Sequence, residues 1–141
     1  MTPLNNEQKQ GIIERINFLK VELADLESKY INISWQEYKD DRDKRRNVER
    51  IVENLANACI DIAKIVLSGE TIEIPGTYQE IILKLGENKI VDISLAEKVA
   101  KLARMRNVLA HQYLDLKWEL IKPLIAEAPD FITKFIDQLK V

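Results

Sequence analysis

The segment RMRNVLAHQY, residues 104–113, holds the side chains of this sequence that are best suited to chemistry. It contains the single histidine, His111, whose ordinary pKa suits proton transfer near neutral pH. Arg104 and Arg106 precede it, and Tyr113 follows two residues later. Because a lone histidine is more often structural than catalytic, its neighbours must decide between the two roles.

Helical geometry predicts a basic stripe on one side of this segment. Seven residues make nearly two turns of an α-helix, so Arg104 is expected above His111 with Asn107 between them. Lys101 adds a positive charge one turn further along the same side. Arg106, five residues before His111, lies roughly 140° around an ideal helix from it. Arg106 and His111 can meet if the helix ends or bends beside them, or across a dimer interface.

An arginine and a histidine without a metal suit one reaction, the cleavage of RNA by its own 2′-OH. His111 could take the proton of that hydroxyl or give one to the leaving 5′-oxygen, and Arg106 could hold the phosphate and stabilise its pentavalent state. DNA lacks the 2′-OH, so the chemistry is restricted to RNA. Since one chain has one histidine, a symmetric dimer would supply the second. Lys101, Arg104 and Asn107 are then candidates for RNA binding, and no metal or cofactor is expected.

Composition predicts a soluble, cytoplasmic chain with one domain over residues 1–141. It is 46% hydrophobic and 31% charged and has a single cysteine. Its first ten residues lack the basic-then-apolar order of a signal peptide, and no apolar run is long enough to span a membrane. The formal net charge of −2 is unlike that of proteins that coat nucleic acid, so RNA binding would need a local basic cleft. Asp40 and Asp41 could bind a metal, but neighbours on a helix point apart.

Hydrophobic periodicity predicts an all-α bundle of four to five helices. Apolar residues at positions 12, 16, 19, 23, 26 and 30 indicate a first long helix, and those at 48, 51, 52, 55, 59, 62 and 66 indicate a second. This second helix is expected to run without a break from a capping box at Ser34 and Glu37 to a left-handed Gly69. A further helix carries Leu95, Val99, Leu102 and Leu109 inward.

Helix ends after residue 69 are predicted from capping and proline signals. Thr77 and Glu80 open a short helix, and Ser94 and Glu97 have the spacing of a capping box for the helix that leads to His111. Pro123 is expected to kink or break the following helix, and Pro129 suits the first turn of a terminal one.

The arrangement of Arg106, His111 and Tyr113 resembles the R-x4-H-x-Y motif of the HEPN superfamily. The likeness is closer to the HepT toxins of HepT/MntA toxin–antitoxin modules, and extends over about residues 8 to 125. The segments that carry it are RNVER (46–50), ANACIDIAKIVL (56–67), IPGTYQEIILKLGENKIVD (74–92) and LAEKVAKLARMRNVLAHQYLDL (95–116).

This resemblance implies a helical homodimer with the motif in a cleft at the interface. It implies a metal-independent endoribonuclease that halts growth by cutting tRNA or mRNA. The implied partner is MntA, a minimal nucleotidyltransferase antitoxin that transfers AMP from ATP to the motif tyrosine, here Tyr113, and larger assemblies with the antitoxin are conceivable. A bulky anionic nucleotide there would block an RNA cleft by size and charge. The resemblance also selects Arg106 over Arg104 as the catalytic arginine.

Other readings of the same residues stay open at this point. The chain could be a non-catalytic helical partner that a nucleotidyltransferase modifies, or a structural adaptor. The basic side chains near His111 could be exposed and paired with Glu97 or Asp115, and Tyr113 could pack on Trp118. The stretch DDRDKRRNVER is read as a solvated face or dimer edge, because its acids nearly cancel its bases.

Overall fold

The computed structural model describes residues 4–70, 72–111 and 113–139, and of His111 only the backbone. Within these ranges the chain is helical and has no strand, which confirms the all-α prediction. The helices are α1 (Asn6–Asp25), a π-helical turn η1 (Leu26–Tyr30), α2 (Trp35–Asp40), α3 (Arg42–Ser68), α4 (Tyr78–Glu87), α5 (Ile93–His111) and α6 (Leu114–Leu139). No helix in the described residues combines the length and apolar character needed to cross a bilayer.

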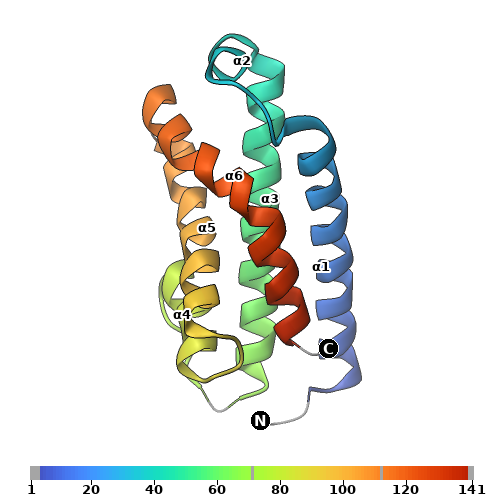
Figure 1. The fold of residues 1–141 in the computed structure, drawn as a ribbon. Helices are drawn as coiled ribbons and strands as arrows, with labels where there is room; N and C mark the ends of the chain where they lie inside the picture. Colours follow the sequence, from blue (N-terminus) through green and yellow to red (C-terminus); the bar gives the residue numbers. More distant parts are fainter. Residues whose placement is uncertain (1–3, 71, 112, 140–141) are drawn as a thin grey trace.

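Helix α3 is the centre of the bundle and packs against α1, α4 and α5 (Figure 1). Helix α4 lies along α5, and α6 packs against α5, crosses obliquely in front of α3 and returns toward the end of the molecule where α1 begins. The apolar stripes predicted for α1 and α3 supply much of the core, which confirms a helix over each stripe. Their fully or nearly fully buried members are Ile12, Leu19, Leu23, Leu26, Val48, Ile51, Val52, Leu55, Cys59, Ile62 and Val66.

The prediction of an unbroken second helix is wrong, because the helix is interrupted at Asp41. The capping box at Ser34 and Glu37 does open a helix, but α2 ends after six residues. Asp41 has extended backbone angles (φ −97°, ψ 97°), and its carboxylate accepts a hydrogen bond from the backbone N–H of Lys44 at 3.1 Å. An aspartate that caps α3 competes with helix continuation, and this break adds a helix to the four to five predicted.

Two predicted helix ends also differ. Gly69 is right-handed (φ −77°, ψ −11°), because its N–H bonds to the carbonyl of Val66 in a tightened last turn and needs no left-handed residue. The capping box at Ser94 is not formed, since α5 begins at Ile93 and the carbonyl of Asp92 accepts from the N–H of Ala96. The predicted cap at Thr77 is confirmed by its hydrogen bond from the N–H of Glu80 at 3.2 Å.

Helix α6 continues through Pro123 and Pro129. Of the kink or break predicted at Pro123, the break is therefore wrong, and Pro129 is not in the first turn of a terminal helix. A proline inside a helix costs about 3 kcal/mol. Burial of one large apolar side chain contributes roughly 1.5–3 kcal/mol, so several such residues outweigh two prolines. The buried residues of α6 are Ile121, Leu124, Ile125, Ala128, Phe131, Ile132, Phe135 and Leu139.

Candidate functional site

The predicted motif lies where α5 ends and α6 begins, at the end of the bundle that also carries α2 (Figure 1). His111 is the last residue of α5, and Leu114 is the first of α6. The side chain of His111 lies outside the described residues, so its meeting with Arg106 stays a prediction. Tyr113 is 80% exposed, and its carbonyl accepts a hydrogen bond from the N–H of Lys117 at 2.9 Å.

Arg106 is half-buried and is held by an aromatic ring of α4. Its guanidinium carbon lies 4.8 Å from the ring centroid of Tyr78, and the Nζ atom of Lys64 lies 5.6 Å from the same centroid. Such cation–π contacts fix a guanidinium in place while leaving its N–H groups free to donate. Tyr78 is the first residue of α4, so the Thr77 cap that starts this helix also positions the support of Arg106.

Arg106 faces a groove between α3 and α5, which we call the α3–α5 groove. The groove has a volume of about 420 Å³ and is open to solvent. Its lining combines three arginines, two glutamates and two apolar residues of α5: Arg46, Glu49, Arg50, Glu53, Arg106, Leu109 and Ala110. An RNA phosphate that enters this groove would meet the guanidinium of Arg106 and two further guanidinium groups from α3.

The predicted RNA-binding residues Lys101 and Arg104 lie on another side of α5. Both are exposed and line a groove between α5 and α6 that has a volume of about 350 Å³ and also contains Glu119 and Glu127. Arg104 and Arg106 therefore line separate grooves. Asn107 is exposed and lines neither of them.

The predicted alternative partners of these basic residues do not pair with them in the described part of the chain. No ion pair within 4 Å joins Lys101 or Arg104 to Glu97 or Asp115 there. Asp115 instead accepts a hydrogen bond from the backbone N–H of Leu116 at 3.0 Å. The charges of Lys101 and Arg104 thus remain available to solvent or to a partner.

A polar contact that sequence spacing does not reveal holds the first turn of α6. Glu49 accepts a hydrogen bond from the Nζ of Lys117 at 3.1 Å and another from the hydroxyl of Tyr38 at 3.2 Å. Burial, aided by the charge of Glu49, raises the pKa of Tyr38 above its ordinary value. Glu49 also lines the α3–α5 groove, so it connects the surroundings of Arg106 with the helix that follows Tyr113.

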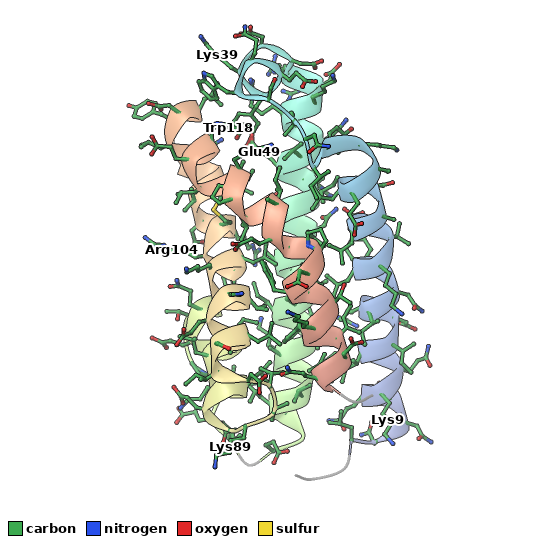
Figure 2. All side chains as sticks on the ribbon, in the orientation of Figure 1. Lys9, Lys39, Glu49, Lys89, Arg104 and Trp118 are labelled. Carbon is green, nitrogen blue, oxygen red and sulfur yellow. The ribbon has the colours of Figure 1, made fainter. Side chains whose placement is uncertain are left out.

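Aromatic packing strengthens this end of the bundle and leaves Tyr113 out. The ring of Trp118 lies 5.2 Å from that of Tyr38 and 5.8 Å from that of Trp35, measured between centroids. Figure 2 labels Trp118 and Glu49 near the α2 end, well away from Lys9 and Lys89. With Trp118 covered by aromatic residues of α2 and Tyr113 largely exposed, packing of Tyr113 on Trp118 does not account for that tyrosine.

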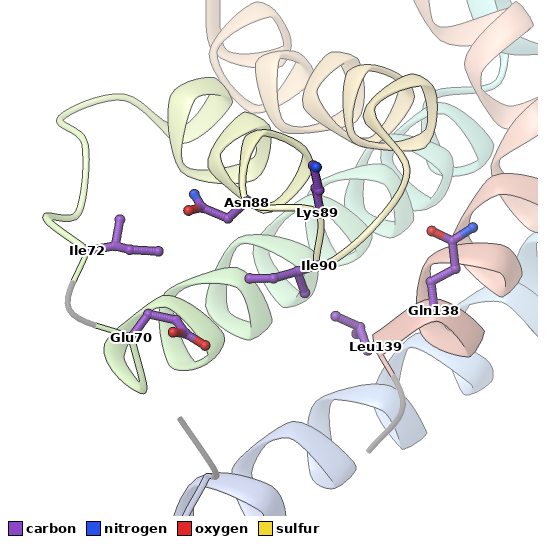
Figure 3. A pocket seen from close by; sticks show the side chains of 7 residues that line it. All are labelled: Glu70, Ile72, Asn88, Lys89, Ile90, Gln138 and Leu139. Carbon is purple, nitrogen blue, oxygen red and sulfur yellow. The ribbon is translucent and has the colours of Figure 1, made fainter. Parts of the chain in front are cut away.

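A separate cavity lies at the opposite end of the bundle and contains none of the predicted site residues. Its volume is about 350 Å³, and Figure 3 shows side chains from the loops around α4 and from the end of α6 around it. The lining residues are Glu70, Ile72, Asn88, Lys89, Ile90, Gln138 and Leu139. This cavity is therefore separate from the predicted site residues.

Comparison with known proteins agrees with this fold. Over 97% of this chain and 98% of the other, the structure aligns with a tri-AMPylated HEPN toxin of Shewanella oneidensis in complex with an MNT antitoxin, with a TM-score of 0.81 and 23% identity. An mRNA nuclease HepT of the same organism is 23% identical over 74% of this chain and 78% of its own. A tRNA nuclease HepT of Aphanizomenon flos-aquae is 31% identical over 62% of this chain and 60% of its own.

The fold is thus that of the HEPN toxins, a class of all-α bundles. The family model described as "Ribonuclease HepT-like" matches residues 19–139, which include α3, α5 and the whole predicted motif. The chain belongs to the ribonuclease HepT-like family. The resemblance found in the sequence is confirmed, and so is the class of enzyme, a ribonuclease, at the level of the family.

Proposed function

We propose that this chain is the toxin of a toxin–antitoxin pair and acts as a metal-independent endoribonuclease on tRNA or mRNA. The observation that carries the proposal is the placement of Arg106. A half-buried guanidinium stands over Tyr78 in an open groove, five residues before the histidine that ends α5. Membership of the ribonuclease HepT-like family supports it, as do relatives named as an mRNA nuclease and a tRNA nuclease.

The reaction is an internal transfer within the RNA. The imidazole of one His111 takes the proton of the 2′-OH, and the 2′-oxygen attacks the adjacent phosphorus. Arg106 donates hydrogen bonds to the phosphate oxygens and stabilises their added charge in the pentavalent state. The bond from phosphorus to the 5′-oxygen breaks, and that oxygen receives a proton from a second imidazolium. The products are a 2′,3′-cyclic phosphate and a 5′-hydroxyl end.

The second imidazolium comes from the second copy of the chain in a symmetric homodimer. The sequence contains one histidine, so one chain supplies one of the two imidazole groups that this mechanism uses. A two-fold axis near the α5–α6 junction would bring both copies of His111 to one cleft. The position of His111 as the last residue of α5 is compatible with such a cleft.

Control of the activity is assigned to Tyr113. An antitoxin of the MntA type, a minimal nucleotidyltransferase, transfers AMP from ATP to its hydroxyl, with pyrophosphate as the leaving group. The phenol is exposed to solvent, as a modified residue must be. A related toxin that has been solved in complex with an MNT antitoxin is itself AMPylated. The added adenylate would fill the RNA cleft and repel the RNA backbone.

An RNA cleavage assay in EDTA tests this proposal. The purified chain should cut total RNA, His111→Ala and Arg106→Ala should lose that activity, and Arg104→Ala should keep most of it. Circular dichroism confirms that each variant is folded. Full cleavage by His111→Ala, or an absolute need for added metal, contradicts the proposed mechanism. An unmodified wild-type homodimer without any cleavage would instead favour a non-catalytic partner that the antitoxin modifies.

A further inference from the structure

The α3–α5 groove contains two arginines to which neither the motif nor the family comparison gives a role. Arg46 and Arg50 are one helical turn apart on α3, so their side chains project from the same face. Both are exposed, and both line the groove together with Arg106 of α5. Arg106 on α5 therefore shares the groove with two guanidinium groups from α3.

The groove carries an excess of positive charge. Of its two glutamates, Glu49 already pairs with Lys117, whose Nζ lies 3.1 Å away. Glu53 forms no ion pair within 4 Å with a described arginine. Three guanidinium groups thus face one unpaired carboxylate, on a chain whose formal net charge is −2. This is a local basic cleft, which an acidic chain needs in order to bind a polyanion.

The acidic and basic side chains of DDRDKRRNVER nearly cancel in number, but the fold gives them different contacts. In DDRDKRRNVER, Asp41 caps α3, Lys44 pairs with Glu37 at 2.7 Å, and Arg45 donates to the backbone carbonyl of Lys39 at 3.0 Å. These contacts occupy much of the segment on the α2 side. They leave Arg46 and Arg50 without an ion pair among the described residues and facing the groove.

We propose that Arg46 and Arg50 form a phosphate-binding subsite that holds the RNA backbone next to the phosphate bound by Arg106. The rise along α3 between Arg46 and Arg50 is about 6 Å, so their guanidinium groups can bind the RNA strand at two successive points. Guanidinium groups bind phosphate oxygens through paired N–H donors, and such contacts position a strand without reading its sequence. The inference rests on the proposed function, since it assigns a role to the groove that contains the catalytic arginine.

Binding of an RNA that cannot be cleaved tests the subsite independently of catalysis. The probe is a single-stranded RNA of mixed sequence with 2′-O-methyl groups throughout, measured by fluorescence anisotropy at several salt concentrations. Arg46→Ala/Arg50→Ala should weaken binding about tenfold or more. It should also flatten the plot of log Kd against log salt by about 1.4, since each phosphate contact on a single strand contributes about 0.7. Arg46→Lys/Arg50→Lys should recover most of the salt dependence but only part of the affinity.

The matched control is Lys9→Ala/Lys20→Ala, which removes two exposed positive charges from α1 and should leave binding within twofold of wild type. The subsite is disproved if the double arginine variant binds like this control. It is also disproved if the loss of affinity follows a loss of the dimer in light scattering, because the arginines are then subunit contacts. Cleavage of unmodified RNA is measured in parallel, so absent cleavage with arginine-dependent binding contradicts the proposed function and not the subsite.

Discussion

Lys117 and Glu49 are 68 residues apart in sequence, and the Nζ of one lies 3.1 Å from the Oε1 of the other. The pair joins the first turn of α6 to α3 and is largely buried, with side-chain exposures of 14% and 18%. Because the backbone N–H of Lys117 also bonds to the carbonyl of Tyr113, the pair holds the first turn of α6 against α3. It thereby ties the exposed tyrosine to the helix that lines the groove of Arg106.

Loss of this ion pair should destabilise the fold. Lys117→Met leaves Glu49 largely buried without its charged partner, which should lower the free energy of unfolding by about 1–3 kcal/mol. Urea denaturation followed by circular dichroism measures the change. Lys134 and Asp130 provide a matched control, because they also lie 3.1 Å apart but are 62% and 67% exposed. Lys134→Met should change stability by less than about 0.5 kcal/mol. Equal effects of the two variants would contradict a special role for the buried pair.

Tyr113 should be dispensable for folding but required for modification. Its hydroxyl is exposed, so Tyr113→Phe should leave the free energy of unfolding within about 0.5 kcal/mol of wild type. Co-expression with the antitoxin should add adenylate to the wild-type chain and none to this variant, as read by intact mass spectrometry. Tyr30→Phe is the control. Tyr30 lies at the end of the π-helical turn and not in the motif, so this variant should still receive adenylate on Tyr113. Adenylate on the Tyr113→Phe chain would place the modification elsewhere.

Two glycines inside helices should respond to alanine in opposite directions. A Cβ atom on Gly86 would lie 2.9 Å from the Cβ of Ala96 and 3.1 Å from the Cα of Ile93, where α4 packs on α5. Gly86→Ala should therefore destabilise the chain by about 1–2 kcal/mol despite the better helix propensity of alanine. Gly11 has only ordinary contacts around the same position, and Gly11→Ala should stabilise α1 by about 0.5–1 kcal/mol. Thermal denaturation of the Gly86→Ala and Gly11→Ala chains measures both effects. A Gly86→Ala chain more stable than wild type would contradict the close packing of α4 on α5 at Gly86.

The thiol of Cys59 should be inert in the folded chain. Cys59 is fully buried on α3, and burial raises its pKa to about 12 from an ordinary value of 9.0. At about pH 8, Ellman's reagent should label it in concentrated urea but not in buffer, because the thiolate is the reactive form. The folded chain keeps the proton that the unfolded chain loses above pH 9.0, so this contribution to stability is complete below pH 9.0 and falls as the pH rises toward 12. Rapid labelling in buffer would contradict the burial of Cys59.

The sequence predicted those parts of the fold that depend on local periodicity. The stripe from Val48 to Val66 is buried as expected, because one face of a long amphipathic helix must lie against the core. The interruption at Asp41 could not be predicted in the same way. A run of charged residues is compatible with a helix, and only the backbone angles decide that an aspartate caps instead of continuing it.

The site was predicted unevenly for a similar reason. Arg106, His111 and Tyr113 were predicted because their spacing along one segment matches a motif, and that assignment stays a prediction. The position of Arg104 on another side of α5 from Arg106 follows from helix geometry. Contacts between helices were not foreseen. The ring of Tyr78 under Arg106 and the placement of Arg50 in the same groove depend on how α4 and α3 dock against α5.

We propose that His111 and Arg106 cut RNA through the 2′-OH beside the scissile phosphate. This proposal is tested most directly by identifying the ends that the purified chain produces in EDTA from a short RNA, and from the same RNA with a single 2′-deoxy substitution at the mapped cleavage position. The expected products are a 2′,3′-cyclic phosphate and a 5′-hydroxyl from the RNA, with no cut at the substituted position. A cut at the 2′-deoxy position, or products with a 5′-phosphate, would contradict the proposal.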